Sequence, residues 1–186
     1  QEYGKVDYLF NNAGVMLQPN ALMKTTLEDW HWIVDTNFWG SLYGLRIFGG
    51  LMFTQPEGGR IVTTASTAGV SAFSGWAPYS VTKTALVRLV ENYQTEAAKF
   101  GLEKVKYNIS LPGVFESDIA NSTLHRGERY NNIGSNGEEM PRSVAHTEAG
   151  DRLGMLTAEE TALIILDQID EGRFYLLPHA DLTERV

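Results

Sequence analysis

Tyr79 and Lys83 stand four positions apart in the segment YSVTK, and they are the residues best suited to do chemistry. On a helix, side chains four positions apart lie on the same face, so the phenol and the ammonium group could enter one cleft. A nearby cation lowers the pKa of a tyrosine from its ordinary value of ~10. A tyrosine tuned in this way can exchange a proton with an alcohol or a carbonyl oxygen. The same spacing also occurs in ordinary solvated surface pairs, so other residues must support a site.

Ser66 is the next candidate, because it follows a β-branched segment over residues 60–65 and precedes Tyr79 by 13 positions. Side chains at the carboxyl ends of parallel strands face the ligand crevice of such sheets. A hydroxyl group there can hydrogen-bond a substrate oxygen and stabilise the charge that develops on it. The alternative role is that of a serine that only caps the loop after the strand.

Asparagines at two places in the chain add to the pattern. The segment Asn11-Asn12-Ala13-Gly14 follows an apolar run, and its residues tolerate unusual backbone angles or close approach of a ligand. A plain turn after a strand is the alternative. Asn37 lies in the middle of an expected helix, where asparagine is unfavourable. Its apolar neighbours indicate a buried polar role, with a purely structural amide as the alternative.

Strand and helix patterns alternate along all 186 residues. Short apolar or β-branched runs predict strands, and apolar residues at helical spacing predict helices. The expected strands cover residues 6–10, 60–65, 105–111 and 173–177, and the expected helices cover residues 27–53, 79–100 and 158–171. This alternation predicts a single α/β domain, a Rossmann-like doubly wound parallel sheet with helices on both faces.

The composition narrows the function classes. The chain has no cysteine, which excludes disulfides, thiolate metal sites and cysteine nucleophiles and is consistent with a cytoplasmic protein. Its net charge of -8, without a basic stretch, argues against nucleic acid and anionic lipid as partners. No apolar run is long enough to span a bilayer, and we expect no membrane partner. The expected partner is a small molecule.

In chain order the features are strand–NNAG, mid-helix Asn, strand–Ser, helix Tyr-xxx-Lys and strand–Pro-Gly. From about Val6 onward this order resembles the short-chain dehydrogenase/reductase family, and NNAG favours its short single-domain subtype. The resemblance implies that Tyr79 is the catalytic acid/base and that Ser66 orients the substrate. It implies that Lys83 binds the nicotinamide ribose and lowers the pKa of the tyrosine, and that Asn37 holds a water in a proton relay to the lysine.

The same resemblance implies an NAD or NADP cofactor, hydride transfer between its nicotinamide and an alcohol or ketone, and no metal. Tyr79 and Lys83 would then serve in both catalysis and cofactor binding. Ser117 stands where family members usually carry a threonine near the cofactor. The other implied cofactor-binding residues are Asn11, Ala13, Gly14, Pro112, Gly113 and Val114. Two alternatives are a non-catalytic truncated member that acts as an interaction module, and an epimerase or dehydratase relative, which NNAG disfavours.

The family's glycine-rich turn, T-G-x-x-x-G-x-G, is absent from these residues. We therefore expect a partial Rossmann-like domain that begins at the fourth strand, with the variable substrate loop at about residues 116–150. In that loop Arg126 could pair with an acidic substrate, and the alternative is a solvated surface arginine. We also expect a homodimer or homotetramer, because the two long helices carry apolar residues on more than one face, including Leu42, Leu45, Phe48, Leu86, Leu89 and Val90.

Overall fold

The fold is built on a four-stranded sheet whose neighbouring strands are all parallel, in the order β1-β2-β3-β4. The computed structural model describes residues 4–130 and 156–179. The strands are β1 (Tyr8–Asn11), β2 (Gly59–Thr64), β3 (Val105–Ser110) and β4 (Tyr175–Leu176). The parallel pairing confirms the predicted α/β class.

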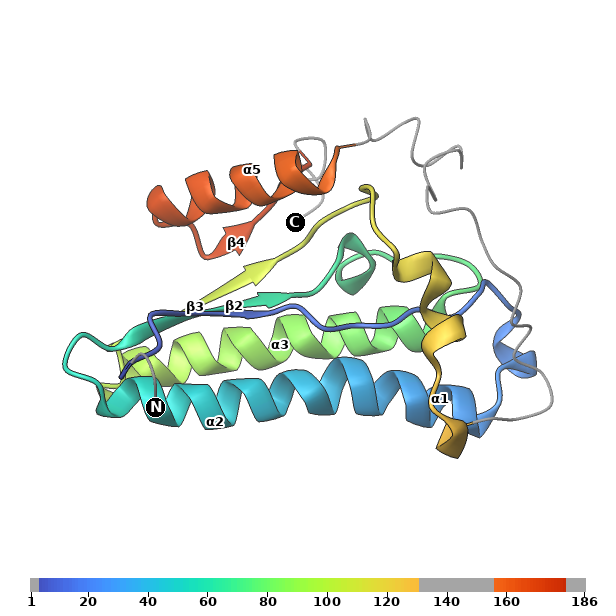
Figure 1. Ribbon diagram of the computed structural model, residues 1–186, viewed down its shortest axis with the longest axis horizontal. Coiled ribbons are helices and arrows are strands. Elements are labelled where there is room, and N and C mark those ends of the chain that lie inside the picture. The colour runs from blue at the N-terminus through green and yellow to red at the C-terminus, as the bar shows by residue number, and fades with distance from the viewer. Residues whose placement is uncertain (1–3, 131–155, 180–186) are drawn as a thin grey trace.

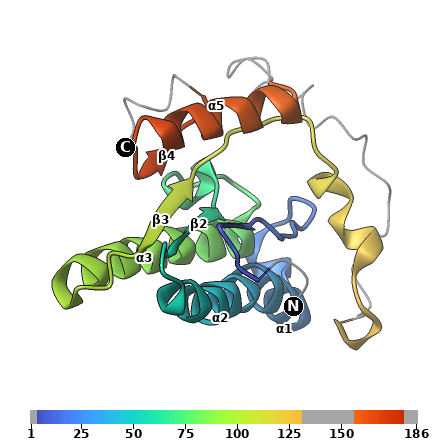
Figure 2. The same ribbon diagram turned by 60° about the vertical axis from the view of Figure 1, so that its left-hand side comes forward.

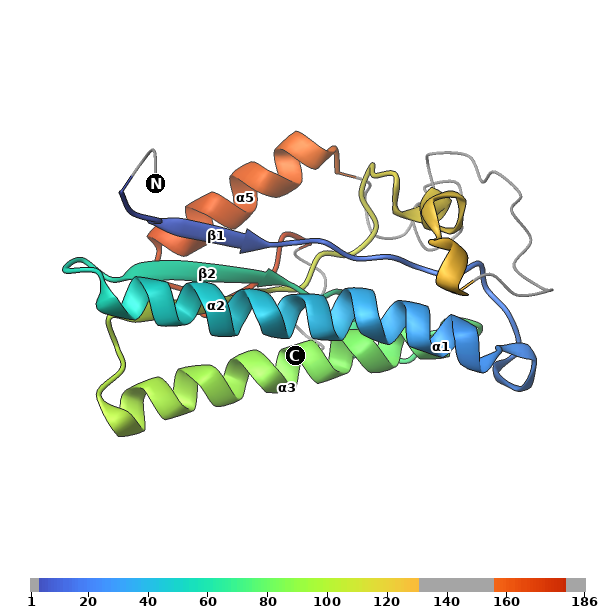
Figure 3. The same ribbon diagram turned by 60° about the horizontal axis from the view of Figure 1, so that its bottom comes forward.

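Helices cover both faces of the sheet, as the alternation predicts (Figure 1). Figures 2 and 3 show the two longest helices side by side on one face, with α5 on the other. The helices are α1 (Leu27–Ile33), α2 (Gly40–Thr54), α3 (Ala77–Phe100) and α5 (Ala158–Asp170). No helix in the described part of the chain is long and apolar enough to cross a membrane.

Strand alternation divides the core between the two faces. Ile61 and Ile109 point to the side of α2 and α3, where they are fully buried with Leu45 and Val90. Val62, the next residue of β2, joins a separate cluster with Ile169 of α5 and Leu176 of β4. The central strands are therefore apolar on both faces, as expected for a sheet between two helical layers.

The helix predicted over residues 27–53 is interrupted. Between α1 and α2 the chain forms a π-helical segment, Val34–Trp39, which contains Asn37. A π-helical turn widens the helix by one residue and is frequently found at functional sites. The side chain of Asn37 is completely buried, so the polar residue that fits an α-helix poorly lies where the regular helix is broken.

The ends of the helices follow local signals. Thr26 and Thr157 each form a capping box, in which the threonine hydroxyl accepts a hydrogen bond from the third helical residue, whose carboxylate accepts one in return. Gly101 ends α3 at φ 69°, in the left-handed region that favours glycine. α3 begins at Ala77, two residues before the predicted start, because Pro78 is well accommodated in a first helical turn.

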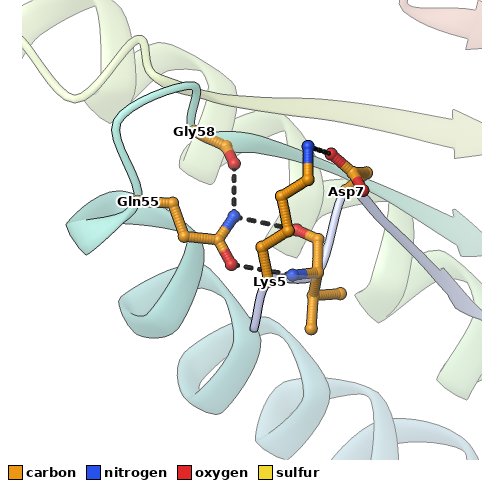
Figure 4. Close-up of polar contacts among 5 residues, drawn as sticks. Lys5, Asp7, Gln55 and Gly58 are labelled. Carbon is orange, nitrogen blue, oxygen red and sulfur yellow. Dashed lines mark hydrogen bonds and ion pairs between the residues drawn. The ribbon is translucent and has the colours of Figure 1, made fainter. Parts of the chain in front are cut away.

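β1 lies at the edge of the described sheet and pairs only with β2 there (Figure 3). Tyr8 and Phe10 are each 49% exposed on the sheet face that also carries Val62, and their rings stack with centroids 6.2 Å apart. Gln55 fixes the chain just before it enters β1 (Figure 4). Its side-chain amide accepts from Val6 N–H at 2.8 Å, and donates to Val6 C=O at 2.9 Å and to Gly58 C=O at 2.6 Å.

Candidate active site

The carboxyl ends of β1, β2 and β3 surround a cavity of about 470 Å³. Such a position, at one end of a parallel sheet, is where doubly wound folds bind ligands. Its lining consists of residues that follow each of the three strands, together with residues from the first turns of α3. Of the residues predicted to form a site, the cavity is lined by Ala13, Gly14, Ser66, Tyr79, Lys83, Pro112, Gly113, Val114 and Ser117.

Tyr79 and Ser66 meet at the floor of this cavity. Ser66 caps the short helical turn Thr67–Gly69, and its hydroxyl accepts from Ala68 N–H at 3.1 Å. Burial raises the pKa of Tyr79 to about 12, and a hydrogen bond with the Ser66 side chain acts in the opposite direction. At neutral pH the phenol is therefore protonated and can donate a proton.

Lys83 lies one turn further along α3, and its side chain is almost fully buried. The ammonium Nζ donates to Thr64 C=O at 2.9 Å and lies 5.5 Å from the centroid of the Tyr79 ring. Burial lowers the pKa of Lys83 to about 8, so the amine is still mostly charged at neutral pH. We expected the lysine to lower the pKa of Tyr79. In this structure desolvation of the phenol outweighs any such effect.

Asn37 does not reach the cavity itself but braces its wall. The side-chain amide accepts from Val15 N–H at 2.7 Å and donates to Val15 C=O at 2.9 Å. The same amide nitrogen donates to the Thr82 hydroxyl at 3.2 Å. A Cβ on Gly14 would lie 3.4 Å from both Asn37 Oδ1 and Lys83 Nζ. Asn37, Gly14 and Lys83 are therefore brought together although they come from three different elements.

Asn11 belongs to the segment predicted to contact the cofactor and steady the sheet, and its own contacts are with α2. Its amide donates to Ser41 C=O at 2.8 Å and packs so closely on Gly44 that a Cβ there would lie 2.8 Å from Asn11 Oδ1. Asn11 thus fastens the end of β1 to α2 and does not line the cavity. Alternation along the strand turns the next residue, Asn12, to the cavity instead.

His179 was not predicted, and it supports the loop after β3. This buried ring accepts from Gly113 N–H through Nδ1 at 3.0 Å, and its Nε2 lies 3.0 Å from Val114 C=O. The loop that lines the cavity is therefore held by a residue 66 positions later in the chain. Nothing in the local sequence around Pro178-His179 signals this contact.

Phe73 and Trp76 are further cavity residues that the sequence reading missed. Their rings continue outward from Tyr79, with centroids 6.5 Å apart for Trp76–Tyr79 and 6.1 Å apart for Phe73–Trp76. Both residues precede α3, so helical spacing could not place them on one face with Tyr79.

Arg126 fits neither of its two predicted roles. Its guanidinium is buried, paired with Asp29 of α1 and stacked 5.2 Å from the centroid of the Trp32 ring. It is therefore not a solvated surface residue, and it is absent from the cavity lining. Residues 131–150 of the predicted substrate loop lie outside the described residues. The part that is described forms two short 3-10 helices, Ile119–His125 and Glu128–Tyr130.

These short helices are fastened to the α1 side of the molecule (Figure 1). Besides the Arg126–Asp29 pair, the Tyr130 hydroxyl donates to the Asp35 carboxylate at 2.6 Å. No cluster of metal-ligating side chains occurs within residues 4–130 and 156–179.

Comparison with known proteins gives a consistent result. A sequence model of the family described as short chain dehydrogenase matches residues 1–127. The C alpha-dehydrogenase of a Sphingobium strain is 26% identical over 98% of this chain, and the 3-oxoacyl-(acyl-carrier-protein) reductase of Escherichia coli is 32% identical over 63% of it. A crystal structure of a short chain dehydrogenase/reductase from Burkholderia phymatum in complex with NAD superposes with a TM-score of 0.84, at 30% identity over 98% of this chain.

The matched regions cover only part of these proteins. The chain spans 58% of the Sphingobium protein, 46% of the Escherichia coli reductase and 64% of the Burkholderia structure.

The buried lysine predicts a specific dependence of stability on pH. Folding lowers the pKa of Lys83 from 10.5 to about 8, so over this interval the unfolded chain holds the proton more tightly and wild-type stability rises with pH. The shift corresponds to about 3 kcal/mol, at about 1.4 kcal/mol per pH unit. Lys83→Met should lack this rise, so its free energy of unfolding relative to wild type should fall by up to that amount between pH 7 and pH 10.5.

Denaturant titrations of both proteins across this range, without cofactor, measure the difference. Lys106→Met, which removes an exposed lysine on β3, is the control and should leave the pH profile parallel to that of the wild type. A parallel profile for Lys83→Met would contradict the burial argument.

Proposed function

The chain belongs to the short-chain dehydrogenase/reductase family, and we propose that it is the catalytic part of an NAD(P)-dependent oxidoreductase that interconverts an alcohol and a ketone. The observation that carries this proposal is the convergence of Ser66, Tyr79 and Lys83 on one cavity, from the end of β2 and from α3. A donor hydroxyl, an acid/base phenol and a buried ammonium are the groups that proton exchange at a carbonyl oxygen requires.

The residues around the cavity fit a nicotinamide nucleotide. Gly14 leaves open the space that a side chain would fill beside Lys83. The lysine ammonium has three hydrogens, and among the described residues it gives one to Thr64 C=O, which leaves donors for ribose hydroxyls. Pro112, Gly113 and Val114 would border the ring, and Ser117 would offer a further hydroxyl. When bound, the nicotinamide supplies or accepts the hydride.

The chain's own residues handle the proton. In ketone reduction, Ser66 would hold the carbonyl oxygen by a hydrogen bond, and Tyr79 would donate its proton to that oxygen as charge develops there. The charge on Lys83 stabilises the phenolate that remains. In alcohol oxidation the same phenolate would accept the hydroxyl proton. The raised pKa of Tyr79 favours the donating form at neutral pH.

We propose that further residues of the same fold precede the chain in the whole protein and pair with β1. In the described sheet β1 pairs only with β2, and an unpaired apolar edge strand invites association. The exposed rings of Tyr8 and Phe10 lie on the sheet face shared with Val62, which further residues of the fold would cover. Related proteins extend well beyond the matched region. The phosphate-binding glycine-rich turn, expected at a helix N-terminus, would lie in that segment.

The protein also fits a homo-oligomer formed through α2 and α3. Of the apolar residues that indicated more than one apolar face on these helices, Leu45, Leu86 and Val90 are fully buried within the chain, against the sheet. A different row remains outside: Tyr43, Ile47 and Leu51 are 55%, 66% and 47% exposed and lie four positions apart on one face of α2. A row of large apolar side chains of this kind is typical of a protein interface.

Replacing the acid/base tests the proposed reaction. In the whole protein, Tyr79→Phe removes the phenolic proton but keeps the ring against Trp76, so turnover of any alcohol or ketone substrate should fall by at least ~10²-fold. Binding of NADH or NADPH, measured by calorimetry, should persist. Tyr93→Phe removes a hydroxyl outside the cavity lining and is the matched control. Turnover near the wild-type rate in Tyr79→Phe would overturn the assignment.

A charge on the outer row of α2 tests the assembly. We expect Ile47→Lys to shift the protein to a smaller species in sedimentation velocity at micromolar concentration, because burying an unpaired ammonium in an apolar interface is costly. Met23→Lys places the same charge on an isolated side chain that is 95% exposed and should not change the assembly. A monomeric wild-type protein would rule out the oligomer.

A further inference from the structure

The part of the cavity beyond the Tyr79 hydroxyl is walled by aromatic rings. Trp76 stands edge-on to the ring of Tyr79 at an interplanar angle of 86°, and Phe73 extends the row at 37° to Trp76. Phe115, Met16 and Ile119 add apolar surface to the same cavity. A flat apolar group would gain contact area and favourable ring geometry there, while an oxygen attached to it meets Ser66 and Tyr79.

The polar groups of the cavity do not favour an anionic substrate. Lys83 is the only lysine or arginine among the described residues that line it, and its charge lies beside Tyr79. The lining also holds the Asp118 carboxylate, which accepts from the Asn121 amide and lies 4.0 Å from the His125 imidazole, where it would oppose an anion bound beside that ring. Arg126, the basic residue that could have recognised a carboxylate, pairs with Asp29 and does not line the cavity.

We propose that the substrate is an uncharged aryl ketone, or the corresponding alcohol, whose ring packs on Trp76 and Phe73. This inference rests on the proposed oxidoreductase function. Ring packing should raise kcat/KM for acetophenone by about 10-fold over octan-2-one, which has the same number of carbon atoms. Benzoylformate has the same ring and ketone but carries a carboxylate in place of the methyl group, and it should be a poorer substrate than acetophenone.

The test uses the whole protein with NADH and NADPH. Trp76→Ala should lower kcat/KM for acetophenone by about 10-fold or more and leave that for butan-2-one within about 3-fold, because the small ketone does not reach the row. Trp76→Phe should keep most of the activity on acetophenone. Phe100→Ala, at the exposed far end of α3, is the control.

Equal kcat/KM for acetophenone and octan-2-one, or a preference for benzoylformate, would overturn the substrate class while leaving the oxidoreductase in place. Absence of turnover with every ketone and alcohol would overturn the proposed function instead. Binding then decides the substrate inference separately. Equilibrium dialysis should show acetophenone bound more tightly than octan-2-one and lost in Trp76→Ala, and equal retention in the variant would contradict it.

His179 carries a second, independent inference. Its Nδ1 accepts from Gly113 N–H, so Nε2 must bear the ring hydrogen and donate it to Val114 C=O. The ring thus links the backbone of two consecutive residues, Gly113 and Val114, in the cavity wall. The fit is close, since a Cβ on Gly113 would lie 3.2 Å from atoms of the His179 ring.

We infer that His179 is a positioning residue that fixes the Gly113–Val114 backbone for contact with the cofactor, an inference that also rests on the proposed function. His179→Phe keeps a ring but removes both hydrogen bonds. His179→Gln replaces them with an amide that can accept from Gly113 N–H and donate to Val114 C=O. We expect the phenylalanine variant to weaken NADH or NADPH binding by about 10-fold or more and the glutamine variant to restore it to within about 3-fold.

Calorimetry on the whole protein gives the cofactor dissociation constant, and amide hydrogen exchange without cofactor reports the loop directly. Exchange at Gly113 should be at least about 10-fold faster in His179→Phe than in wild type and close to wild type in His179→Gln. Unchanged exchange and affinity in His179→Phe would overturn the positioning role.

If that variant does not fold, a glutamine variant with wild-type exchange at Gly113 supports the role, and one with fast exchange overturns it. A wild type that binds neither cofactor would overturn the proposed function and leave exchange to decide the role of His179.

Discussion

The site depends on the buried amide of Asn37, which bonds both the N–H and the C=O of Val15. This contact holds the segment after β1 where Gly14 lies next to Lys83. The π-helical segment that contains Asn37 is part of the same arrangement, because it sets the amide within the turn that faces Val15. If the Val15 N–H and C=O were removed, the buried Asn37 amide would be left without these two hydrogen bonds, and that loss would destabilise the fold.

The same type of contact recurs where other strands begin or end. Gln55 bonds the N–H and C=O of Val6 before β1, and Gln168 of α5 bonds those of Leu177 after β4, at 2.6 and 2.9 Å. Beyond the end of a strand, backbone N–H and C=O groups have no neighbouring strand to bond. A side-chain amide has both a donor and an acceptor, so it can bond the N–H and the C=O of one such residue. Rigid loops follow from this, and rigid loops hold catalytic groups in place.

Burial gives the two central groups opposite changes in pKa. The phenol of Tyr79 becomes a weaker acid and the amine of Lys83 a weaker base, because desolvation disfavours the charged form of each. The protein therefore keeps a buried, desolvated cation in its interior, at a cost to stability that a solvated lysine would not impose. A charge that is poorly solvated interacts more strongly with nearby groups, which suits it to stabilise a phenolate and to bind a polar ligand.

The sequence by itself determined the alternation of strands and helices, the parallel sheet, and the positions of Ser66, Tyr79 and Lys83 at its carboxyl end. These features depend on periodicity and on spacing over a few residues, which a single chain displays directly. The tertiary structure alone decided the π-helical turn at Asn37, the structural role of Asn11 and the raised pKa of Tyr79. It also paired residues far apart in sequence, His179 with Gly113 across 66 positions and Arg126 with Asp29 across 97. Such contacts depend on where the packed layers bring the chain, and no local pattern encodes them.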